Sequence, residues 1–282
     1  CLLVLAGKAG AGERYDLTLT ARTPAGDSLG VVKLAARKEF VRGNIALISQ
    51  FQRPPRGREE GASWRFTDWR AGGEALVSRP EARFGPILWT MYSLSDSRGE
   101  EEFVMKLSAL TGPLGAGDGE KVELFVEREG AWHSLGEAAL DTDAWLATFR
   151  IPRWDEKTAT TYKVVHRERL RDGSEVVDEW SGRIKANADG RGLRIGALTC
   201  QNDYAFPYEP VAENLRKLDP DLLYFSGDQL YENHGGFGVI RAPADPAILN
   251  YLRKFYQHGW AFREVMRNAP TLCLPDDHDV FQ

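Results

Sequence analysis

Three short polar clusters contain the residues of this chain that are best suited to chemistry. Each cluster comes directly after an apolar run, and these runs are "LRIGALT", "DLLYFS" and "PTLCLP". The clusters occupy residues 199–203, 228–234 and 276–279, and they combine carboxylates and amides with a thiol, a phenol and two imidazoles. Side chains of these kinds bind metal ions or transfer protons. In the third cluster, three aspartates and one histidine fall within four residues.

The apolar runs decide whether these clusters can meet. If the runs are parallel strands of one sheet, their carboxyl ends lie along one edge of that sheet, where ligands bind. Carboxylates gathered there repel one another in a low dielectric unless cations neutralise them, and a metal site is the simplest way to do so. The alternative is three hydrated surface loops, because Asp, Asn and Gly also dominate turns. Three clusters in succession favour the metal site.

Residues 1–186 carry the pattern of β structure. The segments "YDLTLTA", "KVELFVE" and "WLATFRI" alternate apolar and polar residues with the period of half-buried strands. "TYKVVHRERL" continues the series, and Asp172-Gly173 after it predicts a hairpin turn. Short strands at this spacing predict an antiparallel β-sandwich, clearest over residues 103–186. Residues 52–86, rich in Arg, Gly, Glu and Pro, are expected to form a long loop or a domain joint.

The pattern changes near residue 190. "KANADGRG" has the small, polar composition of a linker, and "LRIGALT" after it is typical of a parallel strand covered on both faces. Helical segments then alternate with the apolar runs: "YEPVAENLRKLDP", and residues 246–268 as one or two helices broken near Gly259. Strand–helix–strand order predicts an α/β layer. We therefore expect an α+β protein of two domains, with a β-rich region over 1–186, a linker over 187–192 and an α/β part over 193–282.

The bulk composition excludes several classes of protein. The 282 residues carry a net charge of −5 and no basic block, so no nucleic-acid-binding footprint is indicated. No apolar run approaches the roughly 20 residues of a membrane-spanning helix. The three cysteines, Cys1, Cys200 and Cys273, define no disulfide framework. The opening "CLLVLAGKAGAGE" is interpreted either as the remnant of a secretory signal or as an edge strand.

The clusters also resemble a known family. "SGDQLYE" and "LPDDHDVFQ", preceded by a strand that ends in "TCQ", resemble the PhoD-like alkaline phosphatases within the calcineurin-like metallophosphoesterases. The resemblance covers residues 193–282, and the preceding β region is similar in kind to the N-terminal sandwich of that family. It implies a metallophosphatase domain that hydrolyses phosphate mono- or diesters of a small molecule or polymer. It also implies export to a periplasmic, cell-wall or extracellular location.

The resemblance implies a role for each matching residue. Cys200 as thiolate and Tyr231 as phenolate would hold Fe3+, because both are anionic donors suited to iron. Asp228 would bridge that ion to Ca2+, a metal that prefers oxygen ligands. Asp277 and His278 match the element that holds the second metal and faces the phosphate. Asp228 and His278 would be catalytic, with His278 supporting the leaving group as acid or by its charge.

Other residues near these motifs have weaker assignments. Asp276, Asn233 and His234 are candidates for additional ligands, although His234 is also interpreted as the cap of a turn. Cys200 has the alternative of a buried thiol, since free cysteine is among the most buried residue types. Cys273, inside the third strand, is expected to belong to the core, and His258 is expected to be structural.

The sequence departs from the family in one respect, and this keeps other functions open. The chain ends at Gln282, before the further His and Asn ligands of the family, so we expect a fragment of a longer enzyme. One alternative function is a non-catalytic β-sandwich binding module with a degenerate α/β partner, which would bind polysaccharide through Trp64, Trp69 or Trp132. Another is a Zn2+ or Mn2+ phosphoesterase that acts on nucleotides.

Overall fold

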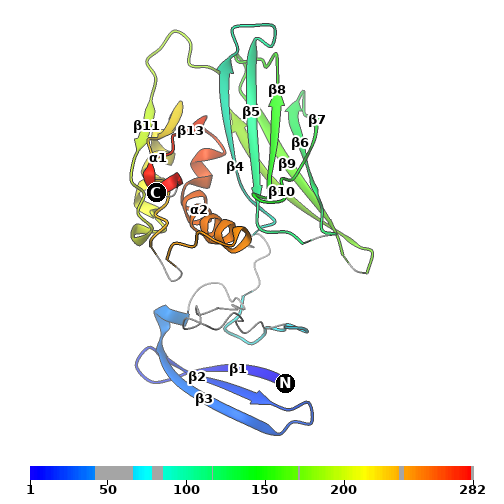
Figure 1. The fold of residues 1–282 in the computed structure, drawn as a ribbon, viewed down its shortest axis with the longest axis vertical. Helices are drawn as coiled ribbons and strands as arrows, with labels where there is room; N and C mark the ends of the chain where they lie inside the picture. The colour runs from blue at the N-terminus through cyan, green and yellow to red at the C-terminus, as the bar shows by residue number, and fades with distance from the viewer. Residues whose placement is uncertain (42–65, 78–84, 116, 171, 235–237, 281–282) are drawn as a thin grey trace. The chain divides into compact units, whose positions relative to one another are not determined.

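The structure is a computed structural model that describes residues 1–41, 66–77, 85–115, 117–170, 172–234 and 238–280. The chain divides into two compact units, Cys1–Val77 and Ser78–Gln282, which run from blue to cyan and from cyan to red in Figure 1. The linker predicted over 187–192 lies inside the second unit. Most of the predicted loop over 52–86 lies outside the described residues. β structure predominates, which confirms the predicted β-rich character.

The first unit contains one antiparallel sheet with strand order β1-β2-β3. Its elements are β1 (Leu2–Ala9), β2 (Arg14–Arg22), β3 (Ser28–Arg37) and the short 3-10 helix η1 (Lys38–Val41). The strand predicted from "YDLTLTA" is β2. Its Leu19 pairs with Leu5 of β1 and Val32 of β3, so these three apolar side chains share one face of the sheet. None of the described residues of this unit is buried.

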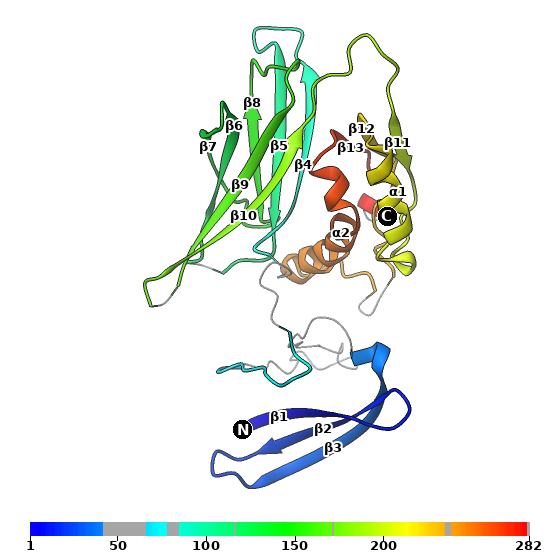
Figure 2. The same cartoon turned by 180° about the vertical axis from the view of Figure 1, so that it is seen from behind.

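The second unit begins with two antiparallel sheets, of strand order β4-β5-β8 and β10-β9-β6-β7. Their strands are β4 (Ile87–Asp96), β5 (Phe103–Thr111), β6 (Lys121–Arg128), β7 (Ala131–Ala139), β8 (Leu146–Ile151), β9 (Thr160–Arg169) and β10 (Glu175–Ile184). β5 and β8 lie in front of β9 and β10 in Figure 1, and Figure 2 shows the reverse from behind. The sheets share one core, with Leu107 and Phe149 from one and Leu124 and Val164 from the other.

Local patterns in this region predicted the local structure correctly. Val122, Leu124 and Val126 alternate along β6 and are all fully buried, as the period of two requires. The Asp172-Gly173 hairpin is present, because β9 and β10 pair in antiparallel fashion and the amide of Leu170 donates to the carbonyl of Ser174. Each of these features depends on residues that are close together in the sequence.

The second unit continues with three short parallel strands, β11 (Ile195–Leu198), β12 (Leu222–Phe225) and β13 (Thr271–Cys273), in that spatial order. The 3-10 helix η3 (Asp203–Ala205) and α1 (Glu209–Leu218) connect the first two strands, and α2 (Ala244–Met266) connects the last two. α3 (Asp277–Val280) follows β13. Parallel pairing places the segments after β11, β12 and β13 at the same end of the sheet.

One face of this parallel sheet is buried and the other is open in the described structure. Gly196, Leu223 and Phe225 face α1 and α2, which lie on that side with Leu215 and Phe262. The opposite face leaves Ile195 and Leu272 about half exposed, at 50% and 46%. The prediction that β11 is covered on both faces is therefore wrong for the described residues. The run is continuously apolar, but such a run does not show which of its faces is packed.

α2 is one continuous helix, so the predicted break near Gly259 is wrong. A Cβ atom at Gly259 would lie 2.2 Å from the ring of Trp89, so the glycine is needed where α2 packs against β4 and not where it bends. His258 beside it is buried among Phe225, Phe255 and Phe262, in agreement with a structural role. None of the helices in the described residues is both long enough and apolar enough to cross a membrane.

Candidate metal centre

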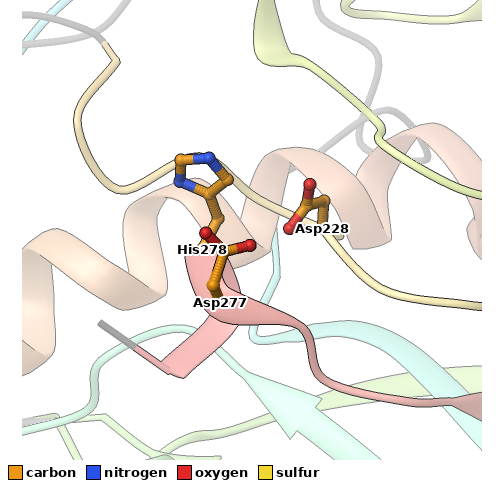
Figure 3. A group of neighbouring side chains, drawn as sticks. All are labelled: Asp228, Asp277 and His278. Carbon is orange, nitrogen blue, oxygen red and sulfur yellow. The ribbon is translucent and has the colours of Figure 1, made fainter. Parts of the chain in front are cut away.

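The ends of β12 and β13 bring three of the predicted site residues together. Asp228, in the turn after β12, and Asp277 and His278, at the start of α3, each offer a ligand atom within 4.8 Å of the other two. Figure 3 shows the carboxylate of Asp277 turned toward that of Asp228, with the ring of His278 beside it. Oxygen ligands lie about 2.4 Å from a calcium ion, so two of them can be up to about 5 Å apart. The spacing therefore suits a single ion of this size.

Cys200 and Tyr231 reach the same aspartate from two further positions. The Sγ atom of Cys200 lies 3.6 Å from Oδ2 of Asp228, and the hydroxyl of Tyr231 donates to that oxygen over 3.1 Å. Cys200 is exposed, so the alternative of a buried thiol does not hold. The other carboxylate oxygen of Asp228, Oδ1, is buried and has no hydrogen-bond partner among the described residues. Asp228 is thus the common neighbour of the predicted ligands Cys200, Tyr231 and Asp277 and of the predicted catalytic residue His278.

Tyr231 is a phenol in the arrangement that the structure shows. Burial raises its pKa well above the usual value, and the neighbouring Cys200 and Asp228 raise it further. A raised pKa favours the neutral hydroxyl, which donates a hydrogen bond to Asp228. A phenolate at this position requires a cation that replaces the proton, as metal ligation does.

The turns that carry these side chains have unusual backbone conformations. Asp228 and Cys200 both have a φ of 55°, which is rare for residues other than glycine, and Gly227 between the strand and Asp228 has a φ of 115°. Two backbone hydrogen bonds continue past the strand ends, from the amide of Cys200 to Gly227 and from that of Gln201 to Asp228. Left-handed residues that are held by their surroundings concentrate at functional sites. Here the left-handed residues Cys200 and Asp228 lie in the turns after β11 and β12, which these two backbone hydrogen bonds hold together.

His278 has a carboxylate partner that sequence analysis did not assign. Its Nδ1 atom lies 2.7 Å from Oε2 of Glu232, which is 8% exposed. The hydrogen bond to Glu232 raises the pKa of His278 above the usual value. Burial alone would raise the pKa of Glu232, but the bond with His278 and nearby charges lower it overall. The available signal was the position of Glu232 directly after Tyr231, at the carboxyl end of an apolar run.

Of the three candidates for additional ligands, Asp276 and His234 lie outside the group of Asp228, Asp277 and His278. His234 bonds to Asp203 through Nδ1 over 2.9 Å, and its ring stacks on that of Tyr231 at 5.1 Å between centroids. Asp276 accepts a hydrogen bond from the amide of Asp277 over 2.9 Å. Asn233 is exposed. Their roles as ligands stay predictions.

The carboxylates at this end of the sheet have few cations to balance them. In the part of the chain that the structure describes, neither Asp228 nor Asp277 forms an ion pair with Lys or Arg. The ammonium of Lys254 donates to the carbonyl of Tyr231 over 2.6 Å and lies 4.0 Å from Asp203. Burial lowers the pKa of Lys254. The net charge of the cluster is therefore negative, which favours binding of a cation.

The remaining predicted residues lie elsewhere. Cys273 is half-buried against the core beneath the parallel sheet, and burial raises the pKa of its thiol to about 12. Of the tryptophans proposed as a carbohydrate platform, Trp69 is 53% exposed and Trp132 is 43% exposed. The ammonium of Lys163 lies 4.9 Å from the ring of Trp132. Trp64 lies outside the described residues.

Comparisons with known proteins do not identify an activity. No family model matches the chain, and no curated protein matches its sequence. Among solved structures, murine CRIg is similar at 11% identity and a TM-score of 0.24, over 34% of this chain and 96% of that one. A GH2 beta-galacturonidase from Eisenbergiella tayi bound to galacturonate is similar at 14% identity and a TM-score of 0.24, over 69% of this chain and 34% of that one. Similarity this low supports no conclusion about function.

Proposed function

We propose that this chain belongs to a metal-dependent hydrolase of phosphate mono- or diesters, of the PhoD-like type. The observation that supports this is the convergence on Asp228 of Cys200, Tyr231, Asp277 and His278, which come from three separate strand ends. The parallel strands β11 to β13 with α1 and α2 would then belong to the α/β layer of a metallophosphoesterase. Exported location is part of the same proposal, through the resemblance.

The residues present fit a pair of metal ions. Asp228 and Asp277 would hold one ion, with His278 beside them, and Cys200 and Tyr231 would hold the other with Asp228 as the bridge. The buried Oδ1 atom of Asp228, which has no partner among the described residues, is available for the second metal of a bridging carboxylate. Fe3+ with Ca2+ is the proposed pair, and Zn2+ or Mn2+ is the alternative. When bound, such a pair lowers the pKa of water and neutralises phosphoryl charge.

The protein side chains contribute proton transfer and orientation. Glu232 holds Nδ1 of His278, so Nε2 is the nitrogen available to the leaving oxygen of the ester. The same hydrogen bond raises the pKa of His278 and favours the charged imidazolium. An imidazolium can donate its proton to a leaving alkoxide or stabilise its negative charge. We propose this role for His278, with Glu232 as its positioning residue.

Elemental analysis combined with a phosphatase assay tests the proposal. The protein is incubated with Fe3+ and Ca2+, or with Zn2+ or Mn2+, desalted, and assayed for metal content and for hydrolysis of 4-nitrophenyl phosphate and bis(4-nitrophenyl) phosphate. We expect bound metal and hydrolysis of one of the esters, both lost in Asp228→Ala. Metal retained in that variant at the wild-type level would argue against Asp228 as the bridging ligand. Absence of bound metal in the wild-type protein favours the alternative of a non-catalytic binding module.

A further inference from the structure

Asp279 is a buried acid beside the predicted ligands to which no role has been assigned. It follows His278 in "PDDHD", and it is 7% exposed. Its Oδ2 atom accepts hydrogen bonds from the amides of Asp228 over 2.7 Å and Asp276 over 3.0 Å. Its Oδ1 atom accepts from the amides of Gln229 over 2.8 Å and Leu230 over 3.3 Å. One carboxylate therefore binds four backbone N–H groups.

These four amides belong to two different turns. Three consecutive ones, at residues 228–230, come from the turn after β12, and the fourth, at Asp276, comes from the turn after β13. Consecutive N–H groups that point into one space form a binding site for an anion, and here the anion is a side chain of the protein itself. The first turn carries Asp228 and the second carries Asp277. Asp279 therefore connects the backbones that hold the two carboxylates of the candidate metal group.

Other contacts pack the same two turns tightly. A Cβ atom on Gly227 would lie 2.5 Å from Cβ of Asp276, so the glycine allows the turns to approach closely. The side-chain amide of Gln229 donates to the carbonyl of Leu274 over 3.0 Å. Tyr251 of α2 donates to the backbone carbonyl of Asp279 over 2.9 Å, so α2 also contacts the residue that carries this carboxylate. The left-handed conformation of Asp228 is the kind of backbone strain that such surroundings maintain.

We propose that Asp279 is a positioning residue that fixes the separation of Asp228 and Asp277 without touching the metal itself. The proposal rests on the proposed function in that these two carboxylates are taken as ligands. Asparagine at this position would keep the shape but replace one acceptor oxygen by an NH2 group, which would face N–H donors. Up to two of the four hydrogen bonds would be lost, and the turn at 228–230 would be free to move relative to Asp277.

Asp221 provides a matched control at the opposite end of the same sheet. Its side chain is 6% exposed and also accepts a backbone hydrogen bond, from the amide of Arg194 over 3.0 Å. Asp221→Asn therefore weakens a similar buried carboxylate and its backbone contact while it leaves the candidate metal group unaltered. A general loss of stability would affect both variants, whereas a positioning effect would appear in Asp279→Asn alone.

The test measures Mn2+ affinity by calorimetry and amide hydrogen exchange of the metal-free protein. In Asp279→Asn we expect Mn2+ affinity to fall 10- to 100-fold, the range found when residues that support metal ligands are replaced. We also expect faster exchange at the amides of residues 228–230. Asp221→Asn should change neither. Wild-type Mn2+ affinity in Asp279→Asn, or unchanged exchange at 228–230, would overturn the proposal.

Two further outcomes are informative. If the wild-type protein binds no Mn2+ but Asp279→Asn still exchanges faster at 228–230, the proposed function fails while Asp279 keeps its role in holding the turns. If Asp279→Asn does not fold, two other measurements test the proposal. These are amide hydrogen exchange in the wild-type protein and Mn2+ binding by Asp279→Glu. Unprotected amides at 228–230, or wild-type affinity in the glutamate variant with its longer side chain, would then overturn the proposal.

Discussion

The two ends of the parallel sheet differ in the groups that balance the charge of their aspartates. At the amino end, Asp221 accepts hydrogen bonds from both terminal nitrogens of Arg191 over 2.7 Å. Asp219 accepts one from the ammonium of Lys185 over 2.6 Å. At the carboxyl end, Asp228 and Asp277 have no such partner in the described part of the chain, and Asp279 is held by backbone N–H groups. The amino end is electrically balanced by its own residues.

This difference shows what makes the carboxyl end a candidate metal centre. Buried or half-buried carboxylates are stable where a guanidinium or ammonium accompanies them, as at Asp221. Where the fold supplies none, the charge is balanced by a proton or by an ion from outside. At this end the hydroxyl of Tyr231 donates a hydrogen bond to Asp228, and burial raises the pKa of that hydroxyl.

Removal of the shared ligand should produce the largest contrast between the two ends. In Asp228→Asn we expect metal content to fall to background and ester hydrolysis to fall by about 10³-fold, since a bound metal contributes several kcal/mol to such a transition state. Asp221→Asn should keep both. Metal analysis and a phosphatase assay on the two variants check this, and equal losses in both would show that the ends do not differ as described.

Removal of the carboxylate that orients His278 should have a smaller effect. Glu232→Gln keeps the size of the side chain but removes the charge beside Nδ1 of His278. We expect kcat to fall about 10- to 100-fold, as for other residues that orient a ligand or catalytic group, with metal content retained. Steady-state kinetics on a metal-loaded sample measure this, and an unchanged kcat would contradict the positioning role of Glu232.

His258 is a third kind of buried ionisable group. Within the described ranges it is paired neither with a charged side chain, as Asp221 is, nor with backbone N–H groups, as Asp279 is. Both ring nitrogens lack hydrogen-bond partners among the described residues, and burial lowers the pKa to about 3. Because the folded state holds its proton less tightly than the unfolded state, stability falls as pH drops from about 6.5 towards 3, by up to about 1.4 kcal/mol per pH unit. The free energy of unfolding, measured with denaturant at several pH values from 7 to 4, should fall less steeply with decreasing pH in His258→Leu than in the wild type. An equal dependence on pH in both proteins would contradict this assignment.

The smallest effect is expected from the balanced end. The hydrogen bonds from Arg191 lower the pKa of Asp221 well below its usual value. A carboxyl with a lowered pKa in the folded state contributes stability above its unfolded pKa, and the contribution is lost as pH falls below about 4. Asp221→Asn should therefore be less stable than the wild type at pH 7, with the difference shrinking towards pH 2. Thermal unfolding at both pH values measures this, and a difference independent of pH would show that charge is not the cause.

Local sequence patterns predicted much of the fold. The alternation in "KVELFVE" gave the buried face of β6, and Asp172-Gly173 gave the turn between β9 and β10, because both signals span a few neighbouring residues. Gly259 shows the limit of such signals. A glycine inside a helical pattern indicates either a break or a close contact, and the contact with Trp89 lies far away in the sequence.

The candidate site divides in the same way. The sequence alone determined that acids, a thiol, a phenol and an imidazole follow three apolar runs, since residue type and order are local facts. The tertiary structure decided which of these groups meet. Glu232 bonds to His278, which is 46 positions away in the sequence. Asp279 accepts hydrogen bonds from three amides that are 49 to 51 positions away, and Arg191 bonds to Asp221 at a separation of 30. Such pairs depend on strand register and on the path of the turns, which no local period encodes.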